Sequence, residues 1–453
     1  MPTYRVVTLG CKLNQADSGG MEQRLRGLGL TPAADPAAAG EAEAGQADLV
    51  ILNTCTVTAR ADTDARRAAR RLRRANPGAL LIATGCLAER DADALRAITA
   101  IDHVVGLARQ ADRVERLAAA AFNRSREAPH PELGPHGATA GCEAAHLSGD
   151  PGADDGRTRA LLKIQDGCNL ACSYCIIPAV RGRSRSLPPD QVLRRISGLS
   201  AAGFREIVFT GVNSGDYGRD LDPPIALHDL LRRALLLPGL GRLRLNSLEP
   251  RTVTPEITGL LASSGGRLAR HLQIPLQSGC DVILHAMRRP YRAADYAALL
   301  ETLRRAIPAI GLGADVIVGF PGETDEQFDQ TRRLIEASPL NYLHVFSYSV
   351  RPGTPAAARP DRVRPEVIRE RRERLRSLGA ELSLRFRRSF LGRTLPALTL
   401  QGRRPDGRLR GLSDNFIDIE IDPGRRRGGL SSNRLLEVRI TAVEPARTLA
   451  SIA

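Results

Sequence analysis

The first hundred residues alternate short apolar runs with stretches of helical periodicity. The apolar runs predict three strands, at residues 4–9, 48–53 and 79–84. The stretches that follow them predict helices near residues 18–28, 58–73 and 88–98. Short strands separated by helices indicate a parallel sheet with helices on both faces. We therefore expect an α/β fold, with a doubly wound parallel-sheet domain at residues 1–115.

The middle of the chain repeats a longer unit in which a strand is followed by a helix. Strands are predicted at residues 160–165, 206–210, 243–247, 271–276, 314–319 and 343–348. Helices are predicted in the gaps, at residues 191–202, 229–236, 296–306 and 325–337. Six such units indicate an incomplete (βα)6 barrel over residues 158–388, whose active site is expected in the loops at the carboxyl ends of the strands.

Two further segments differ from these domains in composition. Residues 116–157, rich in Ala, Gly, Pro and Asp toward their end, are expected to form a linker, which holds Cys142. Residues 362–388 predict a strongly basic helix, either a solvated face or a contact for an RNA backbone. Short strands at residues 395–401, 416–422 and 436–444 predict a small C-terminal β-barrel over residues 389–453, similar to nucleic-acid-binding folds.

Charge and cysteine content narrow the setting. The 453 residues carry a net charge of +15, which favours a polyanionic partner such as nucleic acid. The N-terminus lacks the pattern of a signal peptide, and no apolar run is long enough to span a bilayer. Eight cysteines in such a chain indicate metal ligands or reactive thiols instead of disulfides. We expect a cytoplasmic protein without a membrane partner.

Three cysteines follow the three predicted strands of the first domain. Cys11, Cys55 and Cys86 each lie within two residues of a strand end. Any one of them alone is best explained as a small buried hydrophobe. Because the carboxyl ends of parallel strands meet at one sheet edge, their shared position favours a common cluster.

A second group of three cysteines follows the first strand of the predicted barrel. Cys168, Cys172 and Cys175 lie within eight residues, in a Cys-x3-Cys-x2-Cys pattern. A structural zinc site would need a fourth ligand from a remote part of the chain. Three thiolates around a [4Fe–4S] cluster instead leave one iron open to a non-protein ligand. The pattern therefore favours a site for chemistry, with a metal-stabilised RNA-binding protein as the non-enzymatic alternative.

The Cys-x3-Cys-x2-Cys loop resembles the signature of radical S-adenosylmethionine (SAM) enzymes, whose fold the six-unit barrel also matches. Closer still, Leu-Gly-Cys11-Lys-Leu-Asn-Gln, Asn-Thr-Cys55-Thr-Val and Thr-Gly-Cys86 resemble the amino-terminal domain of radical SAM methylthiotransferases. That family ends in a small RNA-binding β-barrel, the TRAM domain, which the tail with Gly411-Leu-Ser-Asp-Asn-Phe resembles. The resemblance implies two [4Fe–4S] clusters, one on each cysteine triad, and two molecules of SAM, one for the methyl group and one for the 5′-deoxyadenosyl radical.

Three branches of this family compete. They modify isopentenyl-adenosine in tRNA, N6-threonylcarbamoyladenosine in tRNA, or an aspartate of a ribosomal protein. The run Thr-Gly-Val-Asn-Ser-Gly-Asp-Tyr-Gly218 and the run His344-Val-Phe-Ser-Tyr-Ser are most similar to the threonylcarbamoyladenosine branch. The resemblance thus implies methylthiolation of the modified adenosine 3′ of the anticodon, with tRNA and an electron-donor protein as partners and no DNA.

The resemblance also implies residues that contact SAM: Tyr174, Glu249, Gln277, Ser278, Gly319 and Glu323. Each has an alternative role in a turn, a loop cap or the wall of the site. Arg181 and Arg183 either meet a substrate phosphate or form a surface ion pair. Cys280 stands where the family usually has Ser, and we interpret it as a near-isosteric replacement and not as a ligand. No single catalytic residue is predicted.

Overall fold

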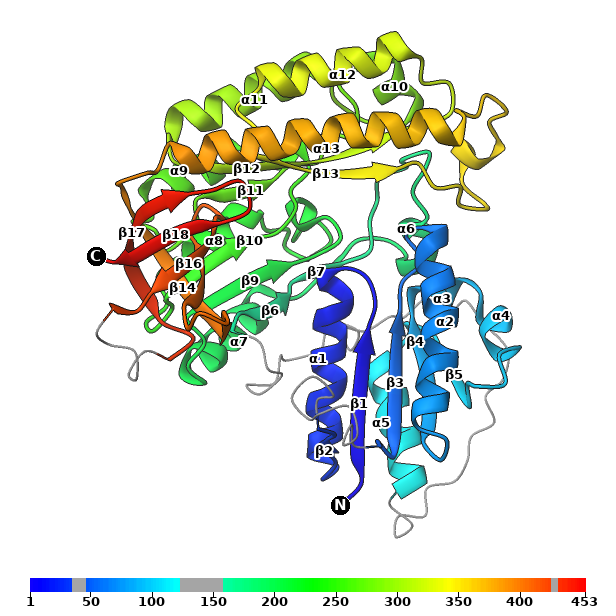
Figure 1. Ribbon diagram of the computed structural model, residues 1–453. Helices are drawn as coiled ribbons and strands as arrows, with labels where there is room; N and C mark the ends of the chain where they lie inside the picture. Colours follow the sequence, from blue (N-terminus) through cyan, green and yellow to red (C-terminus); the bar gives the residue numbers. More distant parts are fainter. Residues whose placement is uncertain (35–45, 123–157, 425–430) are drawn as a thin grey trace. The chain divides into compact units, whose positions relative to one another are not determined.

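The computed structural model in Figure 1 describes residues 1–34, 46–122, 158–424 and 431–453. The chain forms two compact units. Unit 1 comprises Met1–Asp155 together with Ile176–Gly182, and unit 2 comprises Gly156–Cys175 together with Arg183–Ala453. Cys142 and most of the expected linker lie outside the described residues.

Unit 1 is built on a single parallel sheet, with strand order β2-β1-β3-β4-β5. Its strands are β1 (Thr3–Thr8), β2 (Thr31–Pro32), β3 (Leu49–Thr54), β4 (Leu80–Gly85) and β5 (His103–Val105). Its helices are α1 (Lys12–Gly27), α2 (Ala59–Ala75), α3 (Cys86–Arg90), α4 (Ala92–Arg96), α5 (Gln110–Phe122) and α6 (Ile177–Arg181).

Two apolar cores cover the two faces of this sheet. One core joins Met21 and Leu25 of α1 to Val114 and Ala118 of α5, and the other joins α2, α3 and α4. Every residue of β3 is buried, as expected for a central strand with helices on both sides. The predicted doubly wound sheet is therefore confirmed.

The helices of unit 1 differ from the prediction in two places. The helix expected at residues 88–98 is divided into α3 and α4, because Asp91 leaves the helical conformation and its side chain accepts a hydrogen bond from Ala94 N. Helix α5 runs through Phe122, so it crosses the domain boundary expected at residue 115.

The first part of unit 2 consists of parallel strands and helices. The parallel strands are β6 (Ala160–Lys163), β9 (Glu206–Thr210), β10 (Arg242–Leu245), β11 (His271–Gln273), β12 (Gly311–Val318) and β13 (Tyr342–Ser347). The α-helices are α7 (Pro189–Ala201), α8 (Leu227–Leu235), α9 (Pro255–Ser263), α10 (Asp281–Ala286), α11 (Ala293–Ala306), α12 (Asp325–Ala337) and α13 (Pro365–Arg388). The small elements are a hairpin of β7 (Gln165–Asp166) and β8 (Arg185–Ser186), and the 3-10 turns η2 (Ser214–Asp216), η3 (Pro250–Thr252) and η4 (Pro355–Ala358).

These six strands follow one another in chain order across the barrel. β6, β9 and β10 pair in one sheet, and β11, β12 and β13 pair in a second. Isolated parallel bridges, Leu243↔Leu268 and Ser247↔Gln273, connect the two sheets. The predicted six-unit parallel barrel is confirmed, in the form of two three-stranded halves joined by sparse pairing.

The C-terminal part of unit 2 is a closed barrel with strand order β14-β15-β16-β18-β17. Its strands are β14 (Thr394–Arg403), β15 (Leu409–Ser413), β16 (Asp418–Asp422), β17 (Leu435–Val443) and β18 (Thr448–Ile452). Its core includes Leu395, Ile419, Ile421 and Val438. The predicted small β-barrel is confirmed, with two strands more than the sequence pattern indicated.

A buried ionic cluster fixes this small barrel to the larger one. Glu206 of β9 accepts hydrogen bonds from Arg242 Nε (2.6 Å) and Arg244 Nε (2.8 Å), and all three side chains are almost completely buried. The remaining guanidinium nitrogens donate to main-chain carbonyls of the small barrel, including Ser413 O and Asp414 O, both at 3.0 Å from Arg244. Although burial by itself would raise the pKa of Glu206, the two arginines hold that pKa well below its usual range.

Candidate functional site

The three cysteines of unit 1 gather at the carboxyl edge of its sheet. Cys11 follows β1 as the N-cap residue of α1, Cys55 follows β3, and Cys86 begins α3 after β4. Because β1, β3 and β4 are neighbours in the sheet, the three thiols come close enough to influence one another electrostatically. The structure therefore brings together the triad that the sequence predicted.

Gly10 permits this approach. Its φ is +98°, and a Cβ at this position would lie 2.6 Å from Cys55 Cβ and 2.8 Å from Cys55 Sγ. Only glycine combines that conformation with such a close contact. The glycine that precedes Cys11 in the sequence motif is thus required because Cys55 packs directly against it.

Arg181 of α6 lies against this triad within unit 1. Its Nε donates to Cys86 Sγ at 3.3 Å, and its Nη2 contacts Asn14 Oδ1 (2.7 Å) and Asp17 Oδ2 (3.0 Å). Burial raises the pKa of the Cys86 thiol to about 12, and the positive charge of Arg181 opposes that rise. Arg181 is buried, so the alternative of a surface ion pair is wrong for this residue: its pair with Asp17 forms inside the unit.

The second triad occupies the loop that follows β7. Leu170 N donates to Cys168 Sγ at 3.4 Å, and Arg289 Nη1 donates to the buried Cys172 Sγ at 3.1 Å. Burial raises the pKa of Cys168 to about 11, and the nearby Cys172 adds to the rise. A guanidinium thus contacts one sulfur of this triad too.

Arg289 also holds the predicted carboxylate. Its Nη2 forms an ion pair with Glu249, and its Nε lies 3.3 Å from the hydroxyl of Tyr291, which donates to Leu276 O. Glu249 keeps a side-chain exposure of 16%. The carboxylate therefore remains accessible while Arg289 links it to the cysteine loop.

Two other predicted contact residues border this loop. Tyr174 packs against an apolar cluster that includes Cys280, Met287 and Phe320. Gln277 has a φ of +62° and pairs through its main chain with β12, donating to Asp315 O at 2.8 Å. Gln277 therefore stands at a strained position beside the end of a barrel strand, where functional residues are common.

The remaining predicted contact residues shape loops. Ser278 Oγ lies 3.2 Å from Thr331 Oγ1 of α12. Glu323 is buried, where Gly319 N (2.8 Å) and Arg371 Nη1 (2.7 Å) donate to its Oε2. In Gly319, with φ +75°, a Cβ would lie 2.4 Å from Ile368 Cγ1. These contacts hold Ser278 and Glu323 in the loops that follow β11 and β12, and their contact with SAM stays a prediction.

The basic helix has a mixed role. Arg371 of α13 is buried against Glu323, and Arg387 donates to main-chain carbonyls of the small barrel, such as Pro445 O (2.6 Å). Its exposed arginines are Arg369, Arg374, Arg376, Arg385 and Arg388. The helix is therefore partly a structural strut and partly an exposed basic surface.

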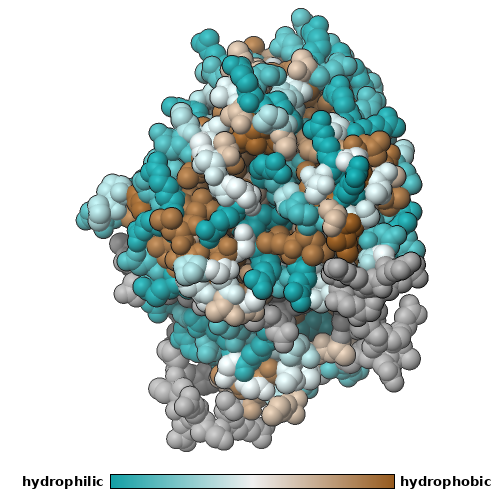
Figure 2. Space-filling model, turned by 90° about the vertical axis from the view of Figure 1, so that its left-hand side faces the viewer, coloured by the Kyte–Doolittle hydropathy of each residue, from teal (hydrophilic) through white to brown (hydrophobic). Residues whose placement is uncertain are grey.

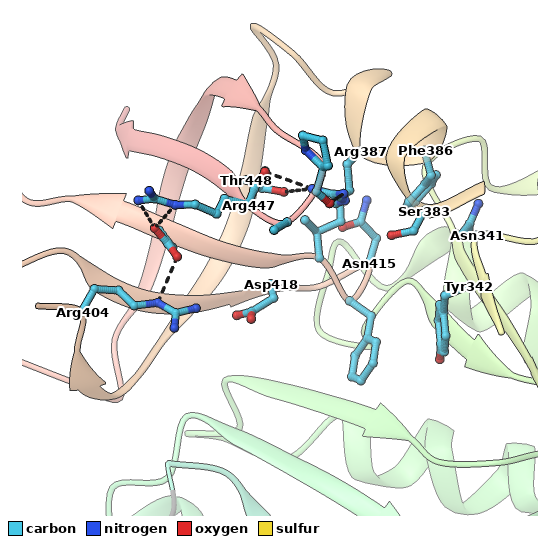
Figure 3. Close-up of a pocket in the computed structure, with 15 residues that line it drawn as sticks. Asn341, Tyr342, Ser383, Phe386, Arg387, Arg404, Asn415, Asp418, Arg447 and Thr448 are labelled. Atoms are coloured by element: carbon cyan, nitrogen blue, oxygen red, sulfur yellow. Dashed lines mark hydrogen bonds and ion pairs between the residues drawn. The ribbon is translucent and has the colours of Figure 1, made fainter. Parts of the chain in front are cut away.

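A cavity of about 330 Å³ lies between α13 and the small barrel, lined by Arg387, Arg404 and Arg447 (Figure 3). Its arginines are engaged with protein groups: Glu420 pairs with Arg404 (3.0 Å) and with Arg447 (2.5 Å). Because Arg404 and Arg447 share Glu420 and Arg387 donates to main-chain carbonyls, these guanidinium groups are already engaged within the protein, which makes the cavity a poor phosphate site. No residue of the cysteine loop lines it.

The surface and the described residues bear on whether the chain has features of a membrane protein or of a single-ion metal site. On the face drawn in Figure 2, hydrophobic residues form patches that hydrophilic residues interrupt. Among the described helices, none has the length and apolar character that crossing a membrane requires. In the same part of the chain, no group of three or more His, Cys, Asp and Glu side chains is arranged to hold a single metal ion.

Comparison with known proteins identifies the family. Residues 162–335 match the Radical SAM superfamily, and residues 3–106 match a family described as Uncharacterized protein family UPF0004. The chain is 35% identical over 423 residues, 92% of its own length and 90% of the relative's, to the threonylcarbamoyladenosine tRNA methylthiotransferase MtaB of Bacillus subtilis. The chain belongs to the radical SAM methylthiotransferase family. Family membership and the enzyme class were both predicted and are confirmed, and the family implies a [4Fe–4S] cluster and SAM as cofactors.

Other relatives of this methylthiotransferase carry a different substrate in their names. The present chain is 35% identical over 444 residues, 93% of its own length and 83% of the relative's, to tRNA-2-methylthio-N(6)-dimethylallyladenosine synthase of Streptomyces viridosporus. Among solved structures, it resembles the radical SAM methyltransferase TsrM of Kitasatospora setae, with a TM-score of 0.54 and 18% identity over 79% of this chain and 77% of that one. At that identity the likeness concerns the fold alone.

Sequence reasoning missed the role of two arginines at the thiols of this methylthiotransferase. Arg289 received no role, and Arg181 was assigned to a phosphate or a surface pair. The signal that could have indicated them is their place: Arg181 follows Cys175 by six residues, and Arg289 directly precedes Pro290 in a loop of the barrel. In a chain with only two lysines, however, a single arginine carries little information.

Proposed function

We propose that this methylthiotransferase converts N6-threonylcarbamoyladenosine in tRNA, 3′ of the anticodon, to its 2-methylthio derivative. The observation that carries the proposal is the presence of two separate cysteine triads, one in each compact unit. One triad suffices for radical SAM chemistry, so the second requires another task. Insertion of sulfur is that task.

The donor sets fit two [4Fe–4S] clusters. Cys11, Cys55 and Cys86 would hold one cluster, and Cys168, Cys172 and Cys175 would hold the other. Each cysteine of such a cluster binds a different iron atom, so its ligands need not converge on one ion. When bound, the clusters would supply the electron for SAM cleavage and the sulfur for transfer. In both triads a buried guanidinium donates to a sulfur, which stabilises the thiolate form that iron requires.

The residues around the second triad would bind and orient SAM. Glu249, accessible and held by Arg289, is suited to the ligand's ammonium group or ribose hydroxyls. Tyr174, Gln277, Ser278, Gly319 and Glu323 would border the same ligand, and the hydrogen bonds of Ser278 and Glu323 would also hold their loops in place.

A tRNA partner agrees with the charge of the chain. The net charge of +15 favours binding to the phosphates of tRNA. The exposed arginines of α13 provide positive charge beside the small barrel. An electron-donor protein and a cytoplasmic location complete the proposal as predictions from the family.

The threonylcarbamoyl substituent rests on the relatives and on the two sequence runs described above. Proteins named for it include those of Bacillus subtilis and Rickettsia prowazekii, the latter 33% identical over 419 residues. The dimethylallyl substituent is the second candidate, because the Streptomyces relative is equally similar.

The test is expression of this chain in a bacterial strain that lacks its own methylthiotransferases for both nucleosides. Mass spectrometry of digested tRNA is expected to show 2-methylthio-N6-threonylcarbamoyladenosine. A strain that accumulates only the 2-methylthio dimethylallyl nucleoside would contradict the substrate assignment, and a Cys172→Ala chain serves as the inactive control.

A further inference from the structure

One face of the second barrel half carries a row of polar and aromatic side chains. In the register of β12 and β13, Asp315 pairs with His344 and Ile317 pairs with Phe346. Residues two apart on a strand share a face, so Tyr342, His344 and Phe346 point to the same side of β13. The opposite side of β13 packs on α13, where Gly379 closely approaches Leu343. The row therefore lies on the face away from α13.

Hydrogen bonds connect the side chains of this row from His271 to His344. Tyr342 lies 2.7 Å from His271 Nε2, and its hydroxyl donates to Gln273 Oε1 at 2.5 Å. That bond orients the Gln273 amide, whose Nε2 donates to Asp315 Oδ1 at 2.7 Å. His344 Nδ1 lies 3.1 Å from the same Asp315 oxygen and 3.1 Å from Gln273 Nε2. The side chains of Asp315 and His344 are thus positioned by the residues behind them.

The row is closed at one end and accessible at the other. Phe416 of the small barrel stacks on His271 with ring centroids 4.2 Å apart, below the guanidinium of Arg244. Its φ of +72° is a strained value for a phenylalanine, which shows how firmly the surrounding contacts hold it. At the other end, the His344 side chain is 53% exposed and Phe346 is 45% exposed.

Two polar atoms at the accessible end remain available. Among the described residues, neither Asp315 Oδ2 nor His344 Nε2 has a hydrogen-bond partner. The carboxylate oxygen accepts hydrogen bonds, and the imidazole nitrogen accepts or, when the ring is protonated, donates. Next to them, the exposed ring of Phe346 offers a surface on which a base can stack.

We propose that Asp315, His344 and Phe346 form the specificity site for the modified adenosine, with Phe346 against the base and the Asp315–His344 pair on the N6 substituent. This inference rests on the proposed function and deepens it. Asp315 and His344 select which N6 substituent the site accepts. Gln273 and Tyr342 are positioning residues that hold the pair in place.

The chemistry of the pair selects between the two candidate substrates. A threonylcarbamoyl group carries N–H and O–H donors for Asp315, and a carboxylate that accepts a hydrogen bond from Nε2 of the protonated His344 ring. A dimethylallyl group offers a hydrocarbon and would leave both polar atoms without partners after their water is displaced. A site built to hydrogen-bond a polar group strongly rejects an analogue that lacks it.

The experiment compares the reconstituted full chain with His344→Leu, His344→Gln and Asp315→Asn variants on tRNA that carries either nucleoside. His344→Leu is expected to lower kcat/KM for the threonylcarbamoyl substrate about 10- to 100-fold, mainly through KM, since one hydrogen bond to a charged group is lost. Formation of 5′-deoxyadenosine without tRNA is expected to stay unchanged. His344→Gln, which keeps a polar hydrogen-bonding group, is expected to retain most of the efficiency. The control His103→Leu changes an exposed histidine of β5 and is expected to behave as wild type.

The outcomes separate the two hypotheses. Wild-type protein that acts only on dimethylallyl-adenosine tRNA would overturn the proposed function. Wild-type protein that acts on the threonylcarbamoyl substrate, together with an unchanged kcat/KM in His344→Leu and Asp315→Asn, would overturn the specificity site alone. Equal losses in His344→Leu and His344→Gln, with slower formation of 5′-deoxyadenosine, would also overturn it, because they would show a purely structural role.

Discussion

The two cysteine triads are assembled in opposite ways. In unit 1, three distant segments bring Cys11, Cys55 and Cys86 to one sheet edge, so that the triad depends on the whole fold of the domain. In unit 2, Cys168, Cys172 and Cys175 lie in one short loop. The first arrangement needs a correctly paired sheet, whereas the second needs only a loop held at the end of a barrel strand.

Despite this difference, the two triads share one local device. A buried arginine donates to one sulfur and also pairs with a carboxylate: Arg181 with Asp17, and Arg289 with Glu249. The comparison teaches that the immediate surroundings of the thiols are alike and the scaffolds are not. The contacts at the thiols therefore do not explain why we propose different tasks for the two triads.

The chain also ties the two triads together covalently. Segment Ile176–Gly182, which carries Arg181, belongs to unit 1 although the residues on either side of it belong to unit 2. It begins directly after Cys175, the last cysteine of the second triad. This segment therefore adjoins the second triad in sequence and contacts the first through Arg181.

The largest difference between the two triads is expected when one cysteine of the second triad is removed. Cys172→Ala is expected to abolish formation of 5′-deoxyadenosine and to remove about four iron atoms per chain, because the site proposed for SAM loses its cluster. Iron analysis and chromatography of the nucleoside check both. Normal 5′-deoxyadenosine in a folded Cys172→Ala chain would refute the assignment of this triad.

The arginine of the second triad comes next. Arg289→Met is expected to slow formation of 5′-deoxyadenosine about 10- to 100-fold, because Cys172 loses a charged hydrogen bond and Glu249 loses its partner. The double variant Arg289→Met with Glu249→Gln separates the effect of an unpaired carboxylate. Arg332→Met, at a surface pair of α12, is the control; if it slowed the reaction as much, the role given to Arg289 would be wrong.

Gly10 tests the dependence of the first triad on its fold. Gly10→Ala is expected to lower iron content by about half and leave 5′-deoxyadenosine formation intact, because the new Cβ displaces Cys55. Gly29→Ala is a matched control: its φ is +82°, so it carries a similar backbone strain of about 1 kcal/mol, but nothing lies within 4 Å of the added Cβ. Equal iron loss in both variants would show that strain and not contact is responsible.

The smallest expected effect concerns Arg181. Replacing it by Met, together with Asp17→Asn so that no buried carboxylate loses its arginine, is expected to lower the reduction potential of the cluster proposed for unit 1. The loss of one charged hydrogen bond, about 1.5 kcal/mol, corresponds to roughly 60 mV for a one-electron couple. Redox titration followed by electron paramagnetic resonance measures it, with Arg96→Met, at an exposed pair of α4, as the control. A reduction potential unchanged from wild type would show that Arg181 does not influence the cluster.

Much of the scaffold was predictable because hydrophobic periodicity is a local property. The strand at Glu206–Thr210 and the helix at Asp325–Ala337 have the predicted bounds, and the helix begins at the capping box of Thr324 and Gln327. Strands β15 and β18 were missed, since β15 is a five-residue run with a central glycine, Gly411, whose pairing is decided by the rest of the barrel. Local patterns cannot report such tertiary pairing.

The site was predictable to a similar limit. Both triads follow from spacing and topology, but the contacts of Arg181 and Arg289 do not, because they join residues 95 and 117 positions apart in sequence. The same holds for the hydrogen bonds that Glu323 accepts from Gly319 and Arg371, which the sequence did not predict. Side-chain partners of this kind are set by packing and not by sequence pattern.

The central claim, that the two triads divide radical formation and sulfur insertion between them, is tested most directly by one assay of a Cys55→Ala chain. The reconstituted protein is given SAM, a reductant and tRNA with N6-threonylcarbamoyladenosine, and both products are measured by mass spectrometry. We expect 5′-deoxyadenosine to form while the 2-methylthio nucleoside is absent. Formation of the methylthio nucleoside at the wild-type rate would contradict the division of labour between the triads.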